Sequence, residues 1–173
     1  MESIVFRKAD KRDAGEIRRV TRKAFEEYAK TVGREDRIDA LRETDEDILA
    51  DIERKHVYIC EVDGQTVGAV RFEILDQGIA YLSRLAVDPE IQSLGIGGLL
   101  LEKARQECAA LGARAITLHT ASRMRSSVAF YLKNGYYIHS ITRDKDYIRA
   151  FMVNELVPMD ELFDYESIVN KKN

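Results

Sequence analysis

The clearest chemical signal in the sequence is a run of glycines that opens a leucine-rich helical pattern, IQSLGIGGLLLEKA at 91–104. Gly95, Gly97 and Gly98 stand at the start of this predicted helix, although a glycine inside a helix costs about 1 kcal/mol relative to alanine. A helix N-terminus carries unpaired N–H groups and the positive end of the helix dipole, and glycines there let an anion approach the main chain. The pattern favours a phosphate-binding turn; the alternative is that Gly97 and Gly98 only permit close packing of the helix on a strand.

Two common phosphate-binding motifs do not describe this turn. A dinucleotide-binding fingerprint requires GxGxxG, but Leu100 stands where the third glycine would follow Gly95 and Gly97. A P-loop requires a GK[ST] sequence, which does not occur in the chain. If the turn binds phosphate, it does so by another arrangement.

The elements that must position this turn alternate between strands and helices. Strands are predicted at 4–7, 56–62, 66–75, 80–87, 115–120, 136–142 and 148–156, and helices from Asp10 to Gly33, from Thr44, from the glycine turn to about 111, and at 126–133. Capping residues predict the helix starts at Asp10 and Thr44 and the stop at Gly33. A helix joins the strands at 80–87 and 115–120, which favours a parallel crossover, and the hairpins elsewhere make the sheet mixed.

Composition favours an ordinary soluble α/β protein. The 173 residues are 45% hydrophobic and 33% charged, and the formal net charge of −3 argues against a general nucleic-acid binder. The two cysteines, Cys60 and Cys108, form no CxxC pair, so neither a zinc site nor a disulfide framework is expected. No signal-peptide or membrane-spanning stretch is evident, and we expect a cytoplasmic protein with no membrane partner.

Two motifs carry a resemblance to a known family. Gln92-x-x-Gly95-x-Gly97, placed after a strand that ends RLAVDP, resembles the acyl-CoA-binding motif of the GNAT superfamily of N-acyltransferases. The segment FYLKNGY at 130–136 is similar to that family's FYxKxGF segment, and the order of elements from Ile4 to Leu156 also matches. The resemblance implies an α/β fold with a mixed, partly splayed sheet of about 6–7 strands flanked by about 4 helices. It implies a single N-acetyltransferase domain over 3–158, followed by a tail at 159–173 that could be helical.

The resemblance implies acetyl-CoA as co-substrate and no metal. The pyrophosphate of coenzyme A would lie against backbone N–H groups of the turn, and the pantetheine arm would bond to the main chain at the end of the preceding strand, as an added strand does. The coenzyme-binding residues implied in this way are Leu85, Ala86, Val87, Gln92, Ser93, Leu94, Gly95, Ile96, Gly97 and Gly98.

The resemblance also implies that the acceptor amine attacks the thioester directly, so that no enzyme nucleophile is needed. It assigns proton donation to the departing thiolate to Tyr131, a phenol that is protonated at neutral pH. The backbone N–H near Leu85 is the natural donor to the oxyanion. The alternative for Tyr131 is a half-buried aromatic residue on a short helix.

The chain departs from the family pattern at the general base and at one coenzyme contact. Many members carry a glutamate about where Ser83 stands, so the candidate bases are Glu73, Tyr81 and His119, and we favour Glu73 or His119 acting through water. Many members also carry an asparagine where Met124 stands. Arg123 and Arg125 could reach the coenzyme phosphates instead, or could simply be a solvated helix start.

The acceptor is expected to be an amine. The sequence does not decide between a small-molecule amine and a peptide amine. Glu43, Asp45, Glu46 and Asp47 could attract a cationic amine, although a helix start explains the same residues. We expect an N-acetyltransferase that moves acetyl from acetyl-CoA to a primary amine without a covalent enzyme intermediate. The alternatives are a protein N-terminal or lysine acetyltransferase, a non-catalytic acyl-CoA-binding module, and an α/β protein without a ligand; a homodimer stays open.

Overall fold

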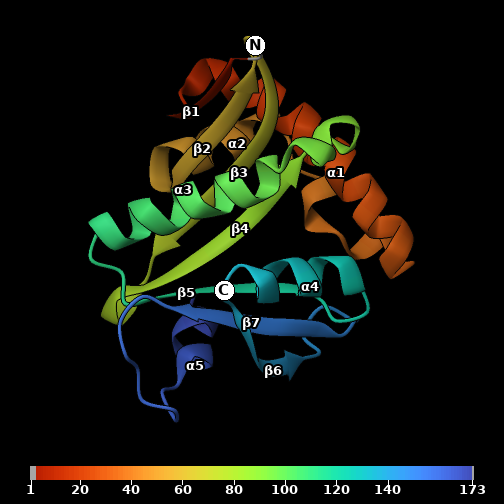
Figure 1. The fold of residues 1–173 in the computed structure, drawn as a ribbon. Helices are drawn as coiled ribbons and strands as arrows, with labels where there is room; N and C mark the ends of the chain where they lie inside the picture. The colour runs from red at the N-terminus through yellow and green to blue at the C-terminus, as the bar shows by residue number, and fades with distance from the viewer. Residues whose placement is uncertain (1–2, 173) are drawn as a thin grey trace. The chain divides into compact units, whose positions relative to one another are not determined.

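The computed structural model describes residues 3–172, and the side chains of Gln92 and Ser93 lie outside what it describes. Figure 1 shows the elements along the chain. The strands are β1 (Ile4–Lys8), β2 (His56–Val62), β3 (Gln65–Ile74), β4 (Ile79–Val87), β5 (Ala115–Ala121), β6 (Tyr137–Thr142) and β7 (Arg149–Glu155). The α-helices are α1 (Ala14–Val32), α2 (Asp45–Arg54), α3 (Ile96–Ala110), α4 (Arg125–Lys133) and α5 (Tyr165–Asn170). Short 3₁₀ helices include η1 (Lys11–Asp13), η2 (Glu35–Arg37), η3 (Asp39–Leu41), η4 (Asp76–Gly78) and η5 (Pro89–Leu94).

The strands of the described residues form one mixed sheet with the order β1-β2-β3-β4-β5-β7-β6. β1 is antiparallel to β2, and β7 is antiparallel to both β5 and β6. β4 and β5 are parallel, with Ile79–Tyr81 in register with Ala115–Thr117, which confirms the predicted crossover through α3. The seven strands and five α-helices confirm the expected mixed α/β class.

Contacts divide the chain into two compact units, which we describe separately. The first comprises Met1–Arg71 and Arg84–Ala104, and the second Phe72–Ser83 and Arg105–Asn173. β3, β4 and α3 each contribute residues to both units, so the division runs through these elements.

In the first unit, local capping chemistry defines the helices that were predicted. Thr44 accepts from the amide of Asp47 at 3.2 Å, while the Asp47 carboxylate accepts from the amide of Thr44 at 2.9 Å, which forms a capping box at the start of α2. α1 ends at Gly33, whose φ of +69° closes the helix through an N–H bond to the Ala29 carbonyl. Ile17 of α1 and Ile48 of α2 are then buried together with Ile59 of β2.

In the second unit, the segment that follows β7 folds back onto the sheet. Tyr165, Ile168 and Val169 of α5 are buried in one cluster with Ile79 of β4 and Phe151 of β7. Asp164 caps this helix by accepting from the amide of Ser167 at 3.0 Å. The tail expected at 159–173 therefore contains a short helix, α5, which packs on the sheet (Figure 1).

Candidate functional site

The glycine turn of the first unit joins η5 to α3 at Gly95. Gly95 is exposed and has a φ of +71°, a conformation that favours glycine, and a Cβ there would meet no atom within 4 Å. The amide of Leu99 donates to the Gly95 carbonyl at 3.2 Å. The amides of Ile96, Gly97 and Gly98 precede that bond and have no acceptor within the helix, so the turn presents main-chain donors with open approach at Gly95.

A buried aspartate fixes the start of this turn. Asp88 has a side chain that is 8% exposed, and it pairs with Lys23 of α1 at 2.9 Å. Its carboxylate also accepts from the amide of Glu90 at 3.0 Å, and its own amide donates to the carbonyl of Val67 on β3 at 2.8 Å. Burial opposes ionisation of Asp88, but the hydrogen bonds from Lys23 and the Glu90 amide, together with the charges of Lys23 and Arg19, outweigh it, so the pKa falls below its usual value. These contacts tie the turn to α1 and β3.

Close packing on a glycine of β3 fixes the start of α3. A Cβ built on Gly68 would lie 2.6 Å from Cδ1 of Leu100, 3.3 Å from Cγ2 of Ile96 and 3.2 Å from the carbonyl of Ala86. Ile96 and Leu100 are fully buried. The helix therefore lies directly on the strand at this point, and its first turn has little freedom to shift.

The end of β4 contains a backbone irregularity next to the expected pantetheine-binding residues. Arg84 has a φ of +53°, which costs a non-glycine residue about 1–2 kcal/mol. Leu85 beyond it is half-buried, and Ala86 and Val87 are buried. The side chain of Arg84 donates through Nε to the Glu43 carboxylate at 2.7 Å, so an ion pair accompanies the irregularity.

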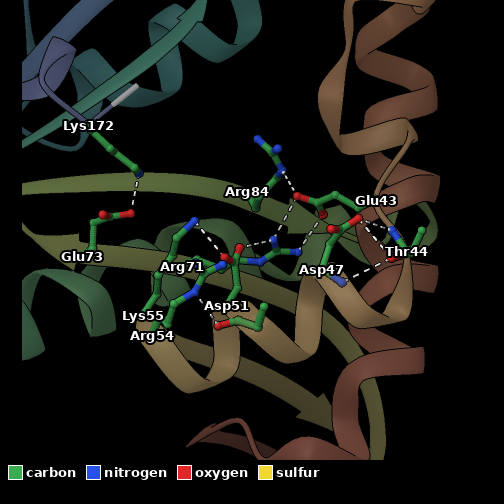
Figure 2. Close-up of polar contacts among 11 residues, drawn as sticks. Glu43, Thr44, Asp47, Asp51, Arg54, Lys55, Arg71, Glu73, Arg84 and Lys172 are labelled. Carbon is green, nitrogen blue, oxygen red and sulfur yellow. Dashed lines mark hydrogen bonds and ion pairs between the residues drawn. The ribbon is translucent and has the colours of Figure 1, made fainter.

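Glu43 belongs to a group of charges that we call the Arg71 cluster, which consists of Glu43, Asp51, Lys55, Arg71 and Arg84 (Figure 2). Arg71 of β3 is 1% exposed and donates to both oxygens of Glu43 at 3.0 Å and to Asp51 at 2.8 Å. Burial opposes ionisation of Asp51, but Lys55 and Arg71 outweigh it and lower its pKa. The cluster links the start of α2 to β3 and β4 within the first unit.

In the second unit, the tyrosine of the FYLKNGY segment lies on α4. Tyr131 is half-buried, and its ring packs edge-on against Tyr136 with centroids 5.6 Å apart. Burial raises the pKa of Tyr131 well above that of a free phenol, so the group keeps its proton at neutral pH. It is a group that can donate a proton to a strong base.

The structure brings Tyr81 and His119, two of the three candidate bases, into direct contact. The Tyr81 hydroxyl and Nδ1 of His119 are 2.9 Å apart, and the imidazole packs against Phe151 with centroids 4.8 Å apart. Burial lowers the pKa of His119 to about 4, with a smaller contribution from Arg149. His119 is therefore neutral at pH 7 and a weak base.

Glu73, the third candidate base, lies on β3 and forms an ion pair with Lys172 (Figure 2). Its side chain is 22% exposed and that of Lys172 is 24% exposed. The ammonium of Lys172 also lies over the Tyr81 ring, 4.6 Å from its centroid. Glu73, Tyr81 and His119 thus form one connected group in the second unit.

The sequence-based predictions did not include the Arg71 cluster or the Lys172 contact, although the first has a signal in the sequence. An arginine in the apolar strand TVGAVRFEI at 66–74 signals a buried ion pair, because an arginine is almost never fully buried unless it is paired. No comparable signal marks Lys172. Of the acidic residues at the start of α2, Glu43 is bound by arginines and Asp47 completes a capping box, which favours the helix-start interpretation for Asp47.

Arg123 and Arg125 are exposed at the start of α4. Within residues 3–172, no group of three or more histidine, cysteine, aspartate or glutamate side chains could hold a metal ion. In the same part of the chain, no helix combines the length and the apolar character that a membrane crossing would need.

Residues 18–136 match the acetyltransferase (GNAT) family. Because this match covers more than half of the chain, the protein belongs to that family, which confirms the resemblance found in the two motifs. None of the curated proteins matches the chain in sequence.

Solved structures with a similar fold include several acetyltransferases. The PaiA N-acetyltransferase from Thermoplasma acidophilum, in complex with coenzyme A, has a TM-score of 0.79 at 23% identity, with 88% of this chain and 99% of that one covered. The yncA protein from Salmonella typhimurium, with its cofactor acetyl-CoA, has a TM-score of 0.73 at 19% identity over 94% of this chain and 99% of that one. The ribosomal-protein-S18-alanine N-acetyltransferase from Escherichia coli has a TM-score of 0.71 at 18% identity over 95% of this chain and all of that one. At these identities the likeness establishes the fold.

Proposed function

We propose that this protein transfers an acetyl group from acetyl-CoA to a primary amine. The observation that supports this most is the turn at the start of α3, where a Cβ at Gly95 would meet no atom within 4 Å and the buried Asp88 holds the loop. Family membership and the presence of coenzyme A or acetyl-CoA in the structures of PaiA and yncA add to it. The amides of Gln92–Gly98 would hold the pyrophosphate, and the main chain of Leu85–Val87 the pantetheine arm.

In the proposed reaction, an ammonium acceptor first loses one proton to a base, directly or through water. The amine nitrogen then bonds to the acetyl carbon, the carbon–sulfur bond breaks, and the nitrogen gives up a second proton as the amide forms. The sulfur leaves as a thiolate and takes a proton from Tyr131, whose phenol regains one from the solvent or from the nitrogen. One proton is released overall, and no covalent enzyme intermediate forms.

The properties of the second unit bear on which residue is the base. His119 is a weak base at neutral pH because its pKa is about 4. Glu73 lies beside Lys172, in the same group as Tyr81 and His119. Of the two, we therefore favour Glu73, with water carrying the proton.

A non-catalytic acyl-CoA-binding module is the second candidate, because Ser83 stands where many family members carry the basic glutamate. Both candidates bind the coenzyme, and only the enzyme releases free thiol when an amine is present. The S18-alanine N-acetyltransferase acts on a protein, so peptide acceptors belong in the test beside small amines.

The test combines a binding assay with a thiol-release assay over a panel of polyamines, amino acids, aminoglycosides and peptide N-termini. Acetyl-CoA should raise the melting temperature of the wild type, since a ligand that binds the folded state stabilises it. Gly97→Leu should abolish that shift. Gly15→Leu is the matched control, because it makes the same change on α1 at a position where a Cβ meets nothing within 4 Å.

Tyr131→Phe should leave the shift with acetyl-CoA unchanged and slow thiol release. Tyr137→Phe, which removes an exposed phenol bonded to Glu155 at 3.0 Å, should leave both unchanged. Binding without thiol release for every acceptor would favour the non-catalytic module. A melting temperature that acetyl-CoA does not move would refute both candidates.

A further inference from the structure

The ammonium group of Lys172 lies in a small site built by two strands of the second unit. Glu73 of β3 supplies a carboxylate, and Tyr81 of β4 supplies the face of its ring, 4.6 Å from the ammonium nitrogen (Figure 2 shows the Glu73 contact). A carboxylate beside an aromatic face is an arrangement that binds cations, because the ring quadrupole and the anion attract the same charge. The geometry is therefore that of an ammonium-binding site.

Burial distinguishes this ion pair from the ordinary surface pairs of the chain. The Lys172 side chain is 24% exposed, whereas Lys11 and Lys30, which also pair with glutamates, are 68% and 65% exposed. A surface pair contributes little, but a partly desolvated ammonium that also contacts an aromatic ring is held more strongly.

A neighbouring histidine holds the site in place. The Tyr81 hydroxyl bonds to Nδ1 of His119 at 2.9 Å, which fixes the orientation of the ring. His119 is neutral at pH 7 and so adds no positive charge beside the ammonium. Helix α5 carries Lys172 to this point because Ile168 and Val169 are buried against the sheet.

We propose that Glu73 and the Tyr81 ring form the subsite that binds the ammonium group of the acceptor, and that Lys172 occupies it as an internal ligand which the acceptor displaces. The proposal rests on the proposed function, since it names the acceptor class of that reaction. The class is a linear primary alkylammonium, the chemistry that a lysine side chain shares with an aliphatic diamine. Lys172 is itself such a group, which is why the subsite fits it.

A tethered ligand competes at an effective concentration on the order of millimolar, so removing it should strengthen the binding of a weak free amine. Calorimetric titration with 1,5-diaminopentane, without coenzyme, should show binding to Lys172→Met that is about fivefold to tenfold tighter than to the wild type. Lys171→Met, the matched control, should match the wild type. 1,5-Pentanediol, which has the same length and no charge, should not compete with the diamine.

Adding Glu73→Gln to Lys172→Met should remove most of the affinity that Lys172→Met has for 1,5-diaminopentane. If that double variant fails to fold, the comparison of Lys172→Met with Lys171→Met still decides the matter. Equal diamine affinity for wild type, Lys171→Met and Lys172→Met would overturn the proposal, and so would absence of diamine binding to all three. A parallel titration with N-acetyl-lysine methylamide shows whether a lysine side chain or a free diamine is preferred.

Kinetics separate this proposal from the proposed function. With a cationic acceptor, Lys172→Met should lower the KM for that acceptor several-fold and leave the KM for acetyl-CoA unchanged. If the protein releases thiol but Lys172→Met and Lys171→Met both keep the wild-type KM for the acceptor, the subsite is refuted and the acetyltransferase activity stands. Tighter diamine binding by Lys172→Met with no thiol release would keep the subsite and refute the acetyltransferase.

Discussion

Removing the negative charge of Glu43 should destabilise the first unit more than any surface substitution of the same kind. Glu43→Gln keeps the size of the side chain but ends its ionic bonds to Arg71 at 3.0 Å and to Arg84 at 2.7 Å. Arg71 is 1% exposed, so its charge cannot turn to water and depends on the remaining ion pair with Asp51. Arg84 loses the ion pair that accompanies its left-handed backbone conformation.

The size of the effect follows from burial. Removing one partner of a buried ion pair costs about 3–5 kcal/mol, and the lower end applies here because Glu43 is 13% exposed and Arg84 is 26% exposed. For a chain of this length, 1 kcal/mol lowers the melting temperature by about 2–4 °C. We therefore expect Glu43→Gln to lower the melting temperature by about 6–12 °C.

Calorimetry or circular dichroism on heating measures this shift, and urea unfolding gives the free energy independently. Glu46→Gln is the matched control, since Glu46 lies on the exposed side of the first turn of α2 and its loss should cost only the helix-dipole contribution, about 0.5 kcal/mol. If the two variants melt within about 2 °C of each other, the Arg71 cluster does not stabilise the first unit.

Three further predictions concern packing, pH and thiol chemistry. Gly68→Ala should destabilise the protein by about 1–3 kcal/mol in a urea titration, because its Cβ would lie 2.6 Å from Leu100 and α3 would have to shift; no loss of stability would contradict the close packing. His119 has a pKa of about 4 when folded and about 6.5 when unfolded, so the unfolded chain binds the proton first and stability falls as the pH drops through this range. Urea unfolding at pH 7 and pH 5 should show a loss of about 2 kcal/mol that His119→Gln lacks. Burial raises the pKa of Cys60 to about 11 and that of Cys108 to about 12, so iodoacetamide at pH 8 should label neither thiol in the native protein and both after unfolding, as read by mass spectrometry.

Features that local chemistry determines were predictable from the sequence. Thr44, Gly33 and the turn at Asp63-Gly64 end or begin elements through contacts within a few residues, and the structure places the boundaries there. The glycine turn before α3 was predicted for the same reason. Its role in coenzyme binding, like that of Tyr131, stays a prediction that the experiments above address.

Features that depend on long-range pairing were not predictable. Glu43 was interpreted as part of an acidic helix start, whereas its partners Arg71 and Arg84 lie 28 and 41 residues further along the chain. The 3₁₀ helices η2 and η3 also escaped prediction, because short polar segments carry no clear period. Lys172 reaches Glu73 only because α5 packs on the sheet, and nothing near Lys172 in sequence signals that contact.

The backbone passes from one unit to the other three times, after Arg71, after Ser83 and after Ala104. Neither unit is therefore encoded by a single uninterrupted stretch of gene. Shortening the coding sequence from the N-terminal side deletes part of the first unit, and shortening it from the C-terminal side deletes part of the second. A minimal fragment should therefore need the whole span from β1 to α5, because Tyr165, Ile168 and Val169 of α5 are buried against the sheet. Truncations that remove residues within this span should lose soluble product.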